Sequence, residues 1–198
     1  MIDDCSDDDG VTEGGLNWWA SFRVQYNFNV SAIRTPENLN FLLASNFGIR
    51  HLFDRTNDDD IIILLSNDVE IRTNFVRQIE DIISQFPMSL VGGILYSTNT
   101  GWNEFGGRLF PYIEGWLLAM DRNGWSAAGI GFDERFAPSD YEDIDLSTAM
   151  GVIGYALIPL NNPGLHHIGG QSIHYGAERM ARTLENKKKF EEKWCKNA

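Results

Sequence analysis

Apolar side chains recur every three or four residues in three segments of the chain, which is the spacing of a helix that buries one face. These segments are residues 12–27, 34–53 and 73–86. The third is the clearest, with Thr73 as a candidate N-cap and Pro87 just past its end. Its inward-facing residues would be Phe75, Ile79, Ile82 and Phe86. The charged stretch at about 176–194 predicts a fourth helix.

Short apolar runs between these segments predict strands. They are residues 28–33, 61–66, 90–96, 106–110, 116–120 and 155–160. The run IIILLSND is apolar without interruption up to Ser66, as expected of a strand buried on both faces of a largely parallel sheet. Helices and strands alternate early in the chain, and short strands cluster later. The pattern therefore predicts one α/β domain over residues 1–198, with a mixed, mostly parallel sheet flanked by helices.

Charge narrows the range of partners. The chain has 16 basic and 28 acidic residues, a formal net charge of -12, which repels a nucleic acid backbone and an anionic membrane surface. A diphosphate would also be repelled unless a divalent cation intervened. No apolar run approaches the ~20 residues of a membrane span, and the N-terminal stretch is acidic where a secretory signal is basic. We therefore expect a cytoplasmic protein without a membrane span.

Acidic residues follow two of the predicted strands. In an open α/β sheet, ligands collect beyond the carboxyl ends of the strands. Asp3, Asp4 and Ser6 follow a short strand at the start of the chain, and Asp68 follows the apolar run. Asp68 is placed to bind a cation that bridges phosphate oxygens, with Glu70 able to point to the same side. The alternative is that Asp68 caps the start of the next segment.

The stretch FDERFAPSDYEDIDLS, residues 132–147, holds six carboxylates within thirteen residues. Ser139 or Asp140 could cap a helix whose positive end favours the acids at Glu142 and Asp143. Three acids in EDID exceed what a cap needs, however. A carboxylate anchored at a cleft can act as a general base if partial desolvation raises its pKa toward neutrality. Both interpretations stay open.

A second candidate site lies in GLHHIGGQS, residues 164–172. His166 and His167 follow a turn at Pro163 and precede a glycine pair, which lets the backbone approach a ligand closely. Imidazole is a common metal ligand, although a histidine in this setting can equally be structural.

Taken in order, these stretches resemble the family-2 glycosyltransferases, which have the GT-A fold, and among them the rhamnosyltransferase-like members. The similarity covers nearly the whole chain, and several moderate motifs in one order make a specific signal. The matching stretches are IDDCSDDDG, IRTPENLNFLLASNFGI, LLSNDVE, GWLLAMDRNGWSAAGIGFDERF, YEDIDLS, HHIGGQS and ENKKKFEEKW.

The resemblance implies an inverting, metal-assisted transfer of a sugar from a nucleoside diphosphate donor to a hydroxyl of a glycan or polysaccharide acceptor. Glu142 and Asp143 match the catalytic pair, with Asp143 as the base. Asp68 and His167 match the residues that hold a divalent cation, Mn²⁺ or Mg²⁺. The donor-binding residues implied are Asp3, Asp4, Ser6, Asn38 and Asp68. The acceptor-side residues implied are Trp116, Phe132, Asp133 and Glu134.

The chain also departs from the family pattern. Ser66 stands where an Asp or Asn is usual, and Asn40 replaces the usual glycine. A strand and a helix normally precede the stretch that contains Asp3, so we expect a chain truncated at its N-terminus relative to the family. The alternative function is therefore a GT-A-like module that binds a nucleotide sugar, a glycan or a protein without catalysis. A nucleotidyltransferase would need a basic, glycine-rich loop near the start, which the sequence lacks.

Overall fold

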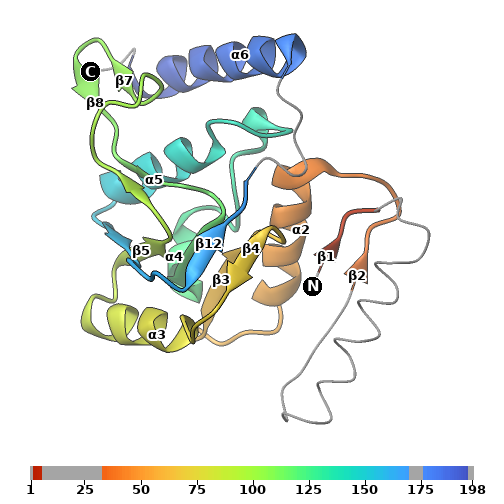
Figure 1. Ribbon diagram of the computed structural model, residues 1–198, viewed down its shortest axis with the longest axis vertical. Helices are drawn as coiled ribbons and strands as arrows, with labels where there is room; N and C mark the ends of the chain where they lie inside the picture. Colours follow the sequence, from red (N-terminus) through yellow and green to blue (C-terminus); the bar gives the residue numbers. More distant parts are fainter. Residues whose placement is uncertain (1, 6–32, 170–175, 196–198) are drawn as a thin grey trace.

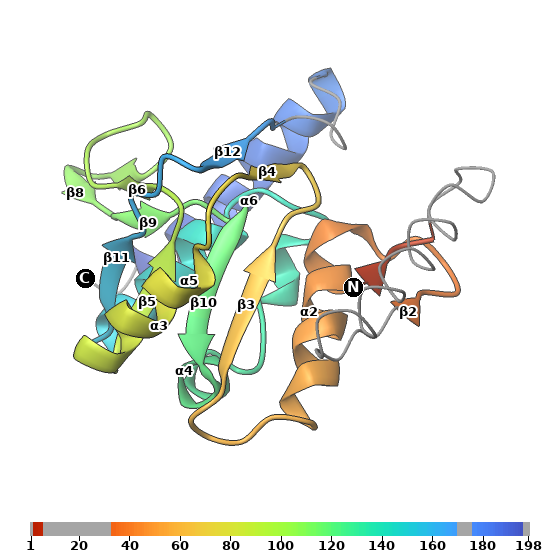
Figure 2. The same ribbon diagram turned by 60° about the horizontal axis from the view of Figure 1, so that its bottom comes forward.

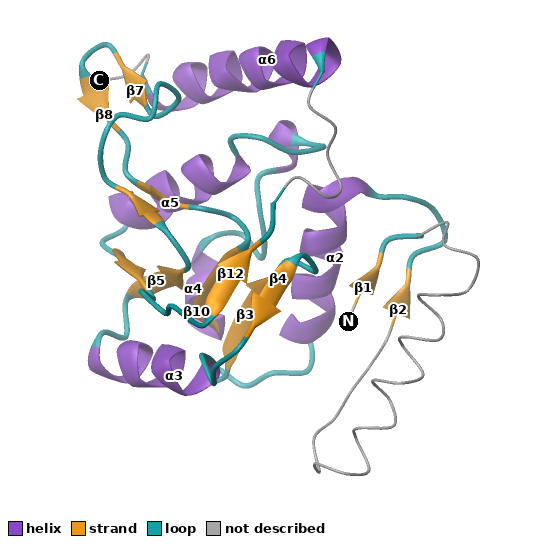
Figure 3. Cartoon of the chain, viewed as in Figure 1, coloured by secondary structure: helices purple, strands orange, loops and turns teal. Residues whose placement is uncertain are grey.

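The computed structural model describes residues 2–5, 33–169 and 176–195, which form an α/β fold (Figures 1 and 3). The helices are α2 (Asn40–Phe53), α3 (Val76–Gln85), α4 (Arg122–Ala127), α5 (Glu142–Val152) and α6 (Ala177–Trp194), with a 3-10 turn at Glu134–Phe136. The strands are β1 (Ile2–Asp3), β2 (Ile33–Arg34), β3 (Ile61–Leu65), β4 (Val69–Ile71), β5 (Ser89–Gly92), β6 (Leu95–Tyr96), β7 (Glu104–Phe105), β8 (Arg108–Leu109), β9 (Tyr112–Ile113), β10 (Leu117–Asp121), β11 (Ala156–Pro159) and β12 (Leu165–His167).

A four-stranded sheet in the order β11-β5-β10-β3 forms the centre of the described residues. Strand β10 runs antiparallel to both of its neighbours, and β11 pairs with β5 in parallel. The sheet is therefore mixed, as predicted, but the expectation that it is mostly parallel is not confirmed, since only one of its three strand pairings is parallel. The uninterrupted apolar run at β3 indicates a strand that is covered on both faces of its sheet. It carries no information about whether the neighbouring strand runs parallel or antiparallel.

Helices cover both faces of this sheet, with α3 on one side and α4 and α5 on the other (Figure 2). Ile62 and Leu64 of β3 pack into the cluster on the α5 side, whereas Ile61, Ile63 and Leu65 face α3. Helix α2 stands between β3 and the two-stranded β1-β2 sheet. No helix within residues 2–5, 33–169 and 176–195 is long and apolar enough to cross a bilayer.

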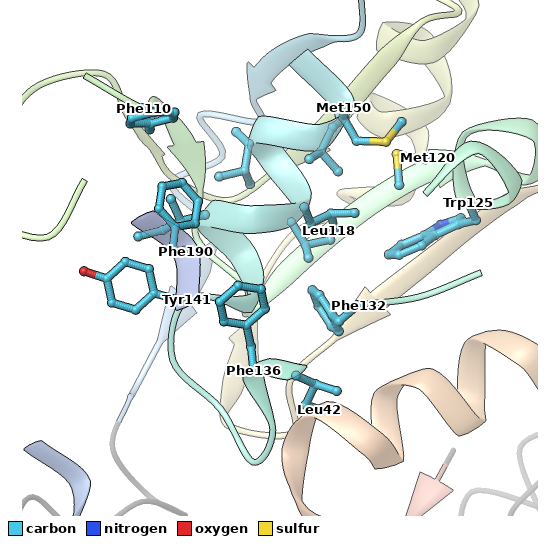
Figure 4. Close-up of a cluster of buried hydrophobic side chains, with 14 of the residues drawn as sticks. Leu42, Phe110, Leu118, Met120, Trp125, Phe132, Phe136, Tyr141, Met150 and Phe190 are labelled. Carbon is cyan, nitrogen blue, oxygen red and sulfur yellow. The ribbon is translucent and has the colours of Figure 1, made fainter. Parts of the chain in front are cut away.

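The larger cluster joins α5 to α6 and to the β7-β8 hairpin through aromatic side chains (Figure 4). Phe190 of α6 is fully buried, with its ring centroid 5.1 Å from those of Phe105 and Phe110 and 5.7 Å from that of Tyr141. At the other end of the cluster, the indole N–H of the buried Trp125 donates to the Ile62 carbonyl, 3.1 Å away. Phe190 thus anchors α6 to the cluster.

The helix in the structure is shorter than the stretch of residues 73–86 that the apolar spacing predicted. It begins at Val76, and the Thr73 hydroxyl donates to Asn162 Oδ1 at 2.8 Å instead of capping the helix. Phe86, expected to face inward, is 54% exposed because the helix ends at Gln85 and the chain leaves the helical register there. A sequence pattern cannot see that Thr73 has a distant partner in the loop before β12.

The predicted helices in 34–53 and 176–194 are confirmed as α2 and α6. The predicted helix 12–27 and most of the predicted strand 28–33 lie outside the described residues. The predicted strand 106–110 is reduced to Arg108–Leu109, which pairs with Glu104–Phe105 in a hairpin.

A side-chain amide fastens α2 to the segment before α5. The carboxamide of Asn46, 1% exposed, donates to the Phe132 carbonyl at 2.9 Å and accepts from the Phe132 N–H at 2.7 Å. Gly131 permits this approach, because a Cβ there would lie 2.3 Å from Asn46 Oδ1. One side chain therefore satisfies both backbone groups of a buried residue.

Replacing Asn46 with alanine would leave both Phe132 backbone groups buried without partners. We expect Asn46→Ala to lower the free energy of unfolding by about 2–4 kcal/mol, since each unsatisfied buried group costs ~1–3 kcal/mol. Denaturant unfolding followed by circular dichroism measures this. Asn123→Ala, on an exposed position of α4, is the matched control and should change stability by less than about 0.5 kcal/mol. Equal effects of the two changes would contradict the assigned role of Asn46.

Candidate functional site

The first turn of α5 brings three acids to one place. The residues before it, Asp140 and Tyr141, have φ of 76° and 78°, the left-handed region that costs a non-glycine residue roughly 1–2 kcal/mol. Tyr141 occupies the N-cap position and makes no side-chain capping bond, so neither Ser139 nor Asp140 is the cap that one of the two sequence interpretations allowed. The positive end of the helix dipole instead meets the acids of the first turn, Glu142, Asp143 and Asp145.

Asp143 is held by two backbone amides. Its Oδ1 accepts from the Ile144 N–H at 2.8 Å, and its Oδ2 accepts from the Gly115 N–H at 3.1 Å. Burial raises the pKa of Asp143 to about 7, with the charge of Glu114 adding to the rise and the two amides opposing it. A carboxyl with a pKa near neutrality can exchange a proton at physiological pH.

The two neighbouring acids are buried differently. Glu142 is 7% exposed, and within the described part of the chain its Oε2 has no hydrogen-bond partner. Burial, followed by the charge of Asp143, raises the pKa of Glu142 well above its usual value. Asp145 instead accepts from Lys193 Nζ at 2.8 Å and from Trp194 Nε1 at 2.7 Å, so its carboxylate is tied to α6.

The segment 114–116, between β9 and β10, connects this helix start to the rest of the site. Gly115 donates to Asp143, while the indole N–H of Trp116 donates to Glu114 Oε2 at 3.2 Å. The Tyr96 hydroxyl reaches the same Glu114 oxygen at 3.4 Å. Sequence reasoning missed Glu114 and Tyr96, because neither belongs to an acidic cluster or a recognisable motif.

Trp116 connects the segment 114–116, which holds Asp143, to the pair formed by Asp68 and His167. His167 lies against the Trp116 ring, with centroids 5.2 Å apart and planes inclined by 18°. His167 Nε2 lies 3.3 Å from Asp68 Oδ1. The backbone of Gly93 lies close against the indole, because a Cβ at Gly93 would lie 1.8 Å from Trp116 Cζ2. The ring is therefore fixed, and it fixes the orientation of His167.

Pairing of two short strands explains why His167 and not His166 meets Asp68. Strand β12 runs antiparallel to β4, with His167 opposite Val69 and His166 opposite Glu70. Adjacent side chains on a strand point to opposite faces, so the two histidines diverge. His166 is exposed, whereas the His167 side chain is 24% and that of Asp68 14% exposed. The sequence-based pairing of Asp68 with His167 agrees with this placement.

The Asp68 and His167 pair offers two ligands for a divalent cation. A carboxylate oxygen and an imidazole nitrogen are donors that first-row divalent ions accept. Among the residues that the structure describes, no group of three or more potential protein ligands converges. An ion held by this pair would have to take its remaining ligands from a bound phosphate and from water, as Mg²⁺-type sites on nucleotides do.

Beside the pair lies a cavity of about 600 Å³. Glu114, Trp116, His166 and His167 contribute to its wall, together with Asn161 and other residues of the loop that leads into β12. Polar hydrogen-bonding groups alternate there with apolar ones such as Leu160 and Ile94. Such a wall suits a polyhydroxylated ligand, and the cavity size falls within the range of small-molecule sites.

Comparison with solved structures gives the fold. No family model matches the chain, and no curated protein matches it in sequence. A mannosyltransferase from Pyrobaculum calidifontis in complex with GDP-Man and Mn²⁺ matches with a TM-score of 0.62 and 16% identity, over 86% of this chain and 48% of that one. GalNAc-T7 with UDP, GalNAc and Mn²⁺ matches with a TM-score of 0.66 and 16% identity, over 98% of this chain and 42% of that one. The fold is that of the GT-A glycosyltransferases.

The chain spans less than half the length of either matched structure. At 16% identity the likeness concerns the fold, and it leaves the family-2 subtype a prediction.

The predicted donor-side residues of this GT-A fold gather at the start of α2. Asp3 is 4% exposed, with Oδ2 3.4 Å from Arg34 Nε. Asp4 Oδ1 accepts from the Leu39 N–H at 2.6 Å, and Asn38 Oδ1 accepts from a neighbouring backbone amide at 3.0 Å. Ser6 lies outside the described residues. Their role in binding a nucleotide stays a prediction.

The predicted acceptor-side residues are not brought together. Trp116 is in the site, but Phe132 is 4% exposed within the core. Asp133 pairs with Arg135 and with Lys193 Nζ at 2.9 Å, and hydrogen bonds from Arg135 hold its pKa well below the usual value. Glu134 pairs with Arg50 on α2, 2.7 Å away. The last three therefore connect α2, α5 and α6, and their part in acceptor binding stays a prediction.

The raised pKa of Asp143 should make the free energy of unfolding depend on pH. Its folded pKa of about 7 exceeds the unfolded value of 3.8, so between these values the folded state holds a proton that the unfolded state has lost. The free energy of unfolding should therefore fall as pH rises through this window, by up to about 1.4 kcal/mol per pH unit, and level off above it. We expect Asp143→Asn to flatten this slope.

Urea unfolding at a series of pH values tests this expectation. Asp81→Asn, the same chemical change at an exposed position of α3, is the control and should leave the slope intact. A slope unaltered by Asp143→Asn would place the titrating group elsewhere.

Proposed function

We propose that the chain is a metal-assisted, inverting glycosyltransferase of the family-2, rhamnosyltransferase-like type. It would move a sugar from a nucleoside diphosphate donor to a hydroxyl of a glycan or polysaccharide acceptor. The observation that carries the proposal is the Asp143 carboxyl, with a pKa raised to about 7, joined through Gly115 and Trp116 to the Asp68 and His167 pair. A proton acceptor and a candidate cation site are thus fixed by one short segment.

The donor side of the proposal rests on charge. A chain of net charge -12 needs a cation to hold two phosphates, and Asp68 with His167 would hold it. The ion would neutralise the diphosphate and stabilise the charge of the leaving group. Both matched structures are complexes with a nucleotide and Mn²⁺, which supports the same choice of partner for this chain.

The acceptor side rests on Asp143. Both of its oxygens already accept a backbone N–H, and each retains a lone pair for a further proton donor. The acceptor hydroxyl gives its proton to Asp143 while its oxygen bonds to the anomeric carbon. The bond from that carbon to the diphosphate oxygen breaks, and the electron pair leaves with the nucleoside diphosphate. A base with a pKa near the working pH is effective in such a step.

Glu142 has a supporting part in this proposal. Burial, followed by the charge of Asp143, raises the pKa of its carboxyl well above the usual value, which favours the protonated form. Protonation of Glu142 would remove a negative charge beside Asp143, and like charges disfavour ionisation. The cavity of about 600 Å³ beside Trp116 gives room for a sugar.

Metal-dependent binding of a nucleotide is the first test. We expect UDP, dTDP or GDP to bind measurably by calorimetry with Mn²⁺ and at least about tenfold more weakly in chelator, because the acidic chain repels the free diphosphate. His167→Ala should remove most of the Mn²⁺-dependent gain. His51→Ala, at a histidine of α2 that does not contribute to the cavity wall, is the matched control. Equal affinity with and without Mn²⁺ would remove the cation from the mechanism.

Turnover is the second test. We expect Asp143→Asn to lower kcat by a factor of roughly 10² to 10⁴, the usual contribution of a positioned general base, and to leave donor affinity nearly unchanged. Release of nucleoside diphosphate in the presence of candidate acceptors measures kcat, and calorimetry measures affinity.

The Asp81→Asn chain again serves as control. Wild-type turnover that survives Asp143→Asn would assign the base to another residue. A chain that binds donor and Mn²⁺ yet transfers no sugar to any acceptor would instead be a GT-A module that binds without catalysis.

A further inference from the structure

Side chains of helix α6 form hydrogen bonds to the turn that precedes α5. The carboxamide nitrogen of Asn186, fully buried, donates to the carbonyls of Phe136 at 2.9 Å, Ser139 at 3.0 Å and Asp140 at 3.0 Å. Three carbonyls of the segment 136–140 thus accept from a single side chain of a helix more than forty residues away in sequence. In Figure 1, α6 runs along the top of the molecule above α5.

The carboxylate of Asp140 is held from the same helix. Arg179 Nη2 donates to Asp140 Oδ1 at 2.8 Å, and the Thr183 hydroxyl donates to Asp140 Oδ2 at 2.8 Å. Both side chains of this ion pair are largely shielded, at 14% exposure for Asp140 and 22% for Arg179. Together with Asn186, these contacts fix Asp140 by its backbone and by its side chain.

These contacts from α6 explain why the backbone at residues 140–141 can adopt an unfavourable conformation. Asp140 and Tyr141 are consecutive non-glycine residues at positive φ, a conformation that persists only when the surroundings impose it. The Tyr141 hydroxyl adds a bond to the Trp102 carbonyl at 2.8 Å. The turn leads directly into Glu142 and Asp143, so its shape decides where the first turn of α5 points.

Two acids in the first turn of α5 make contacts on different sides of the helix. Asp145 is tied to Lys193 and Trp194 of α6, while Asp143, two residues earlier and so on another side of α5, reaches Gly115. The α6 contacts on the turn and on Asp145 thus lie on one side of α5, and the contact of Asp143 with the segment 114–116 lies on another.

We propose that Asn186, Arg179 and Thr183 of α6 are positioning residues for Asp143, acting through the left-handed turn at 140–141. The proposal rests on the proposed function for its catalytic consequence. Its structural part, that α6 sets the environment of the Asp143 carboxyl, can be measured without turnover. None of the three residues needs to touch a substrate.

The test uses Asn186→Ala and the milder Thr183→Val, which keeps side-chain shape and removes only the hydroxyl. Proteins labelled with ¹³C-aspartate report the Asp143 carboxyl by NMR, assigned by its loss in Asp143→Asn. Loosening the turn should admit water to a carboxyl whose pKa is raised mainly by burial. We expect the apparent pKa of Asp143 to fall by about one unit or more in Asn186→Ala, and by less in Thr183→Val.

Two controls separate positioning from general destabilisation. Ile79→Val removes a methyl from a fully buried residue on the opposite face of the sheet, and Lys188→Ala alters an exposed position of α6. Both should leave the Asp143 titration unchanged. In an active preparation, Asn186→Ala should lower kcat by about 10- to 100-fold, as expected for a displaced catalytic group, with a smaller change in the KM for donor.

The outcomes distinguish this inference from the proposed function. A shifted Asp143 pKa in a chain without transferase activity supports positioning and contradicts the function. An active enzyme whose Asp143 titration and kcat are untouched by both Asn186→Ala and Thr183→Val contradicts positioning and supports the function. Should Asn186→Ala fail to fold, the Thr183→Val titration decides the question, because removing one hydroxyl leaves the buried packing of α6 in place.

Discussion

The hydrogen bond from the Gly115 N–H to the Asp143 carboxylate is the contact on which the arrangement of the site depends. It joins the N-terminal end of α5, where acids are favoured by the helix dipole, to the segment that enters the central strand β10. On the other side of that segment, Trp116 holds His167 by stacking, and His167 meets Asp68. Two clusters of polar side chains thus share one rigid support.

Burial and backbone geometry set the chemistry of the acids more than their number does. Three acids share the first turn of α5, yet each has a different environment. Asp145 is neutralised by Lys193, Glu142 is buried without a partner, and Asp143 is held between two amides. Desolvation raises the pKa of all three, most notably those of Glu142 and Asp143, and that of Asp143 reaches about 7.

Contacts from helix α6 also hold α5, on the side away from the segment 114–116. Its buried Asn186 and its ion pair with Asp140 hold a backbone conformation that side chains disfavour, and its Phe190 completes the aromatic cluster. An exposed charged helix at the end of a sequence is easily taken as a solubilising surface. Here its inward face determines the direction of α5, which is a tertiary effect invisible in the charge pattern.

The sequence by itself determined the presence of helices α2, α3 and α6, the buried strands and the motif order that resembles GT-A enzymes, because apolar periodicity and short motifs are local signals. It also singled out Asp68, His167 and Asp143. The tertiary structure alone decided the antiparallel direction of β10, the failure of Thr73 to cap α3, and the parts played by Glu114 and Asn186. Each of these depends on a partner far away in sequence, and neither propensity nor spacing encodes which distant backbone group a side chain will meet.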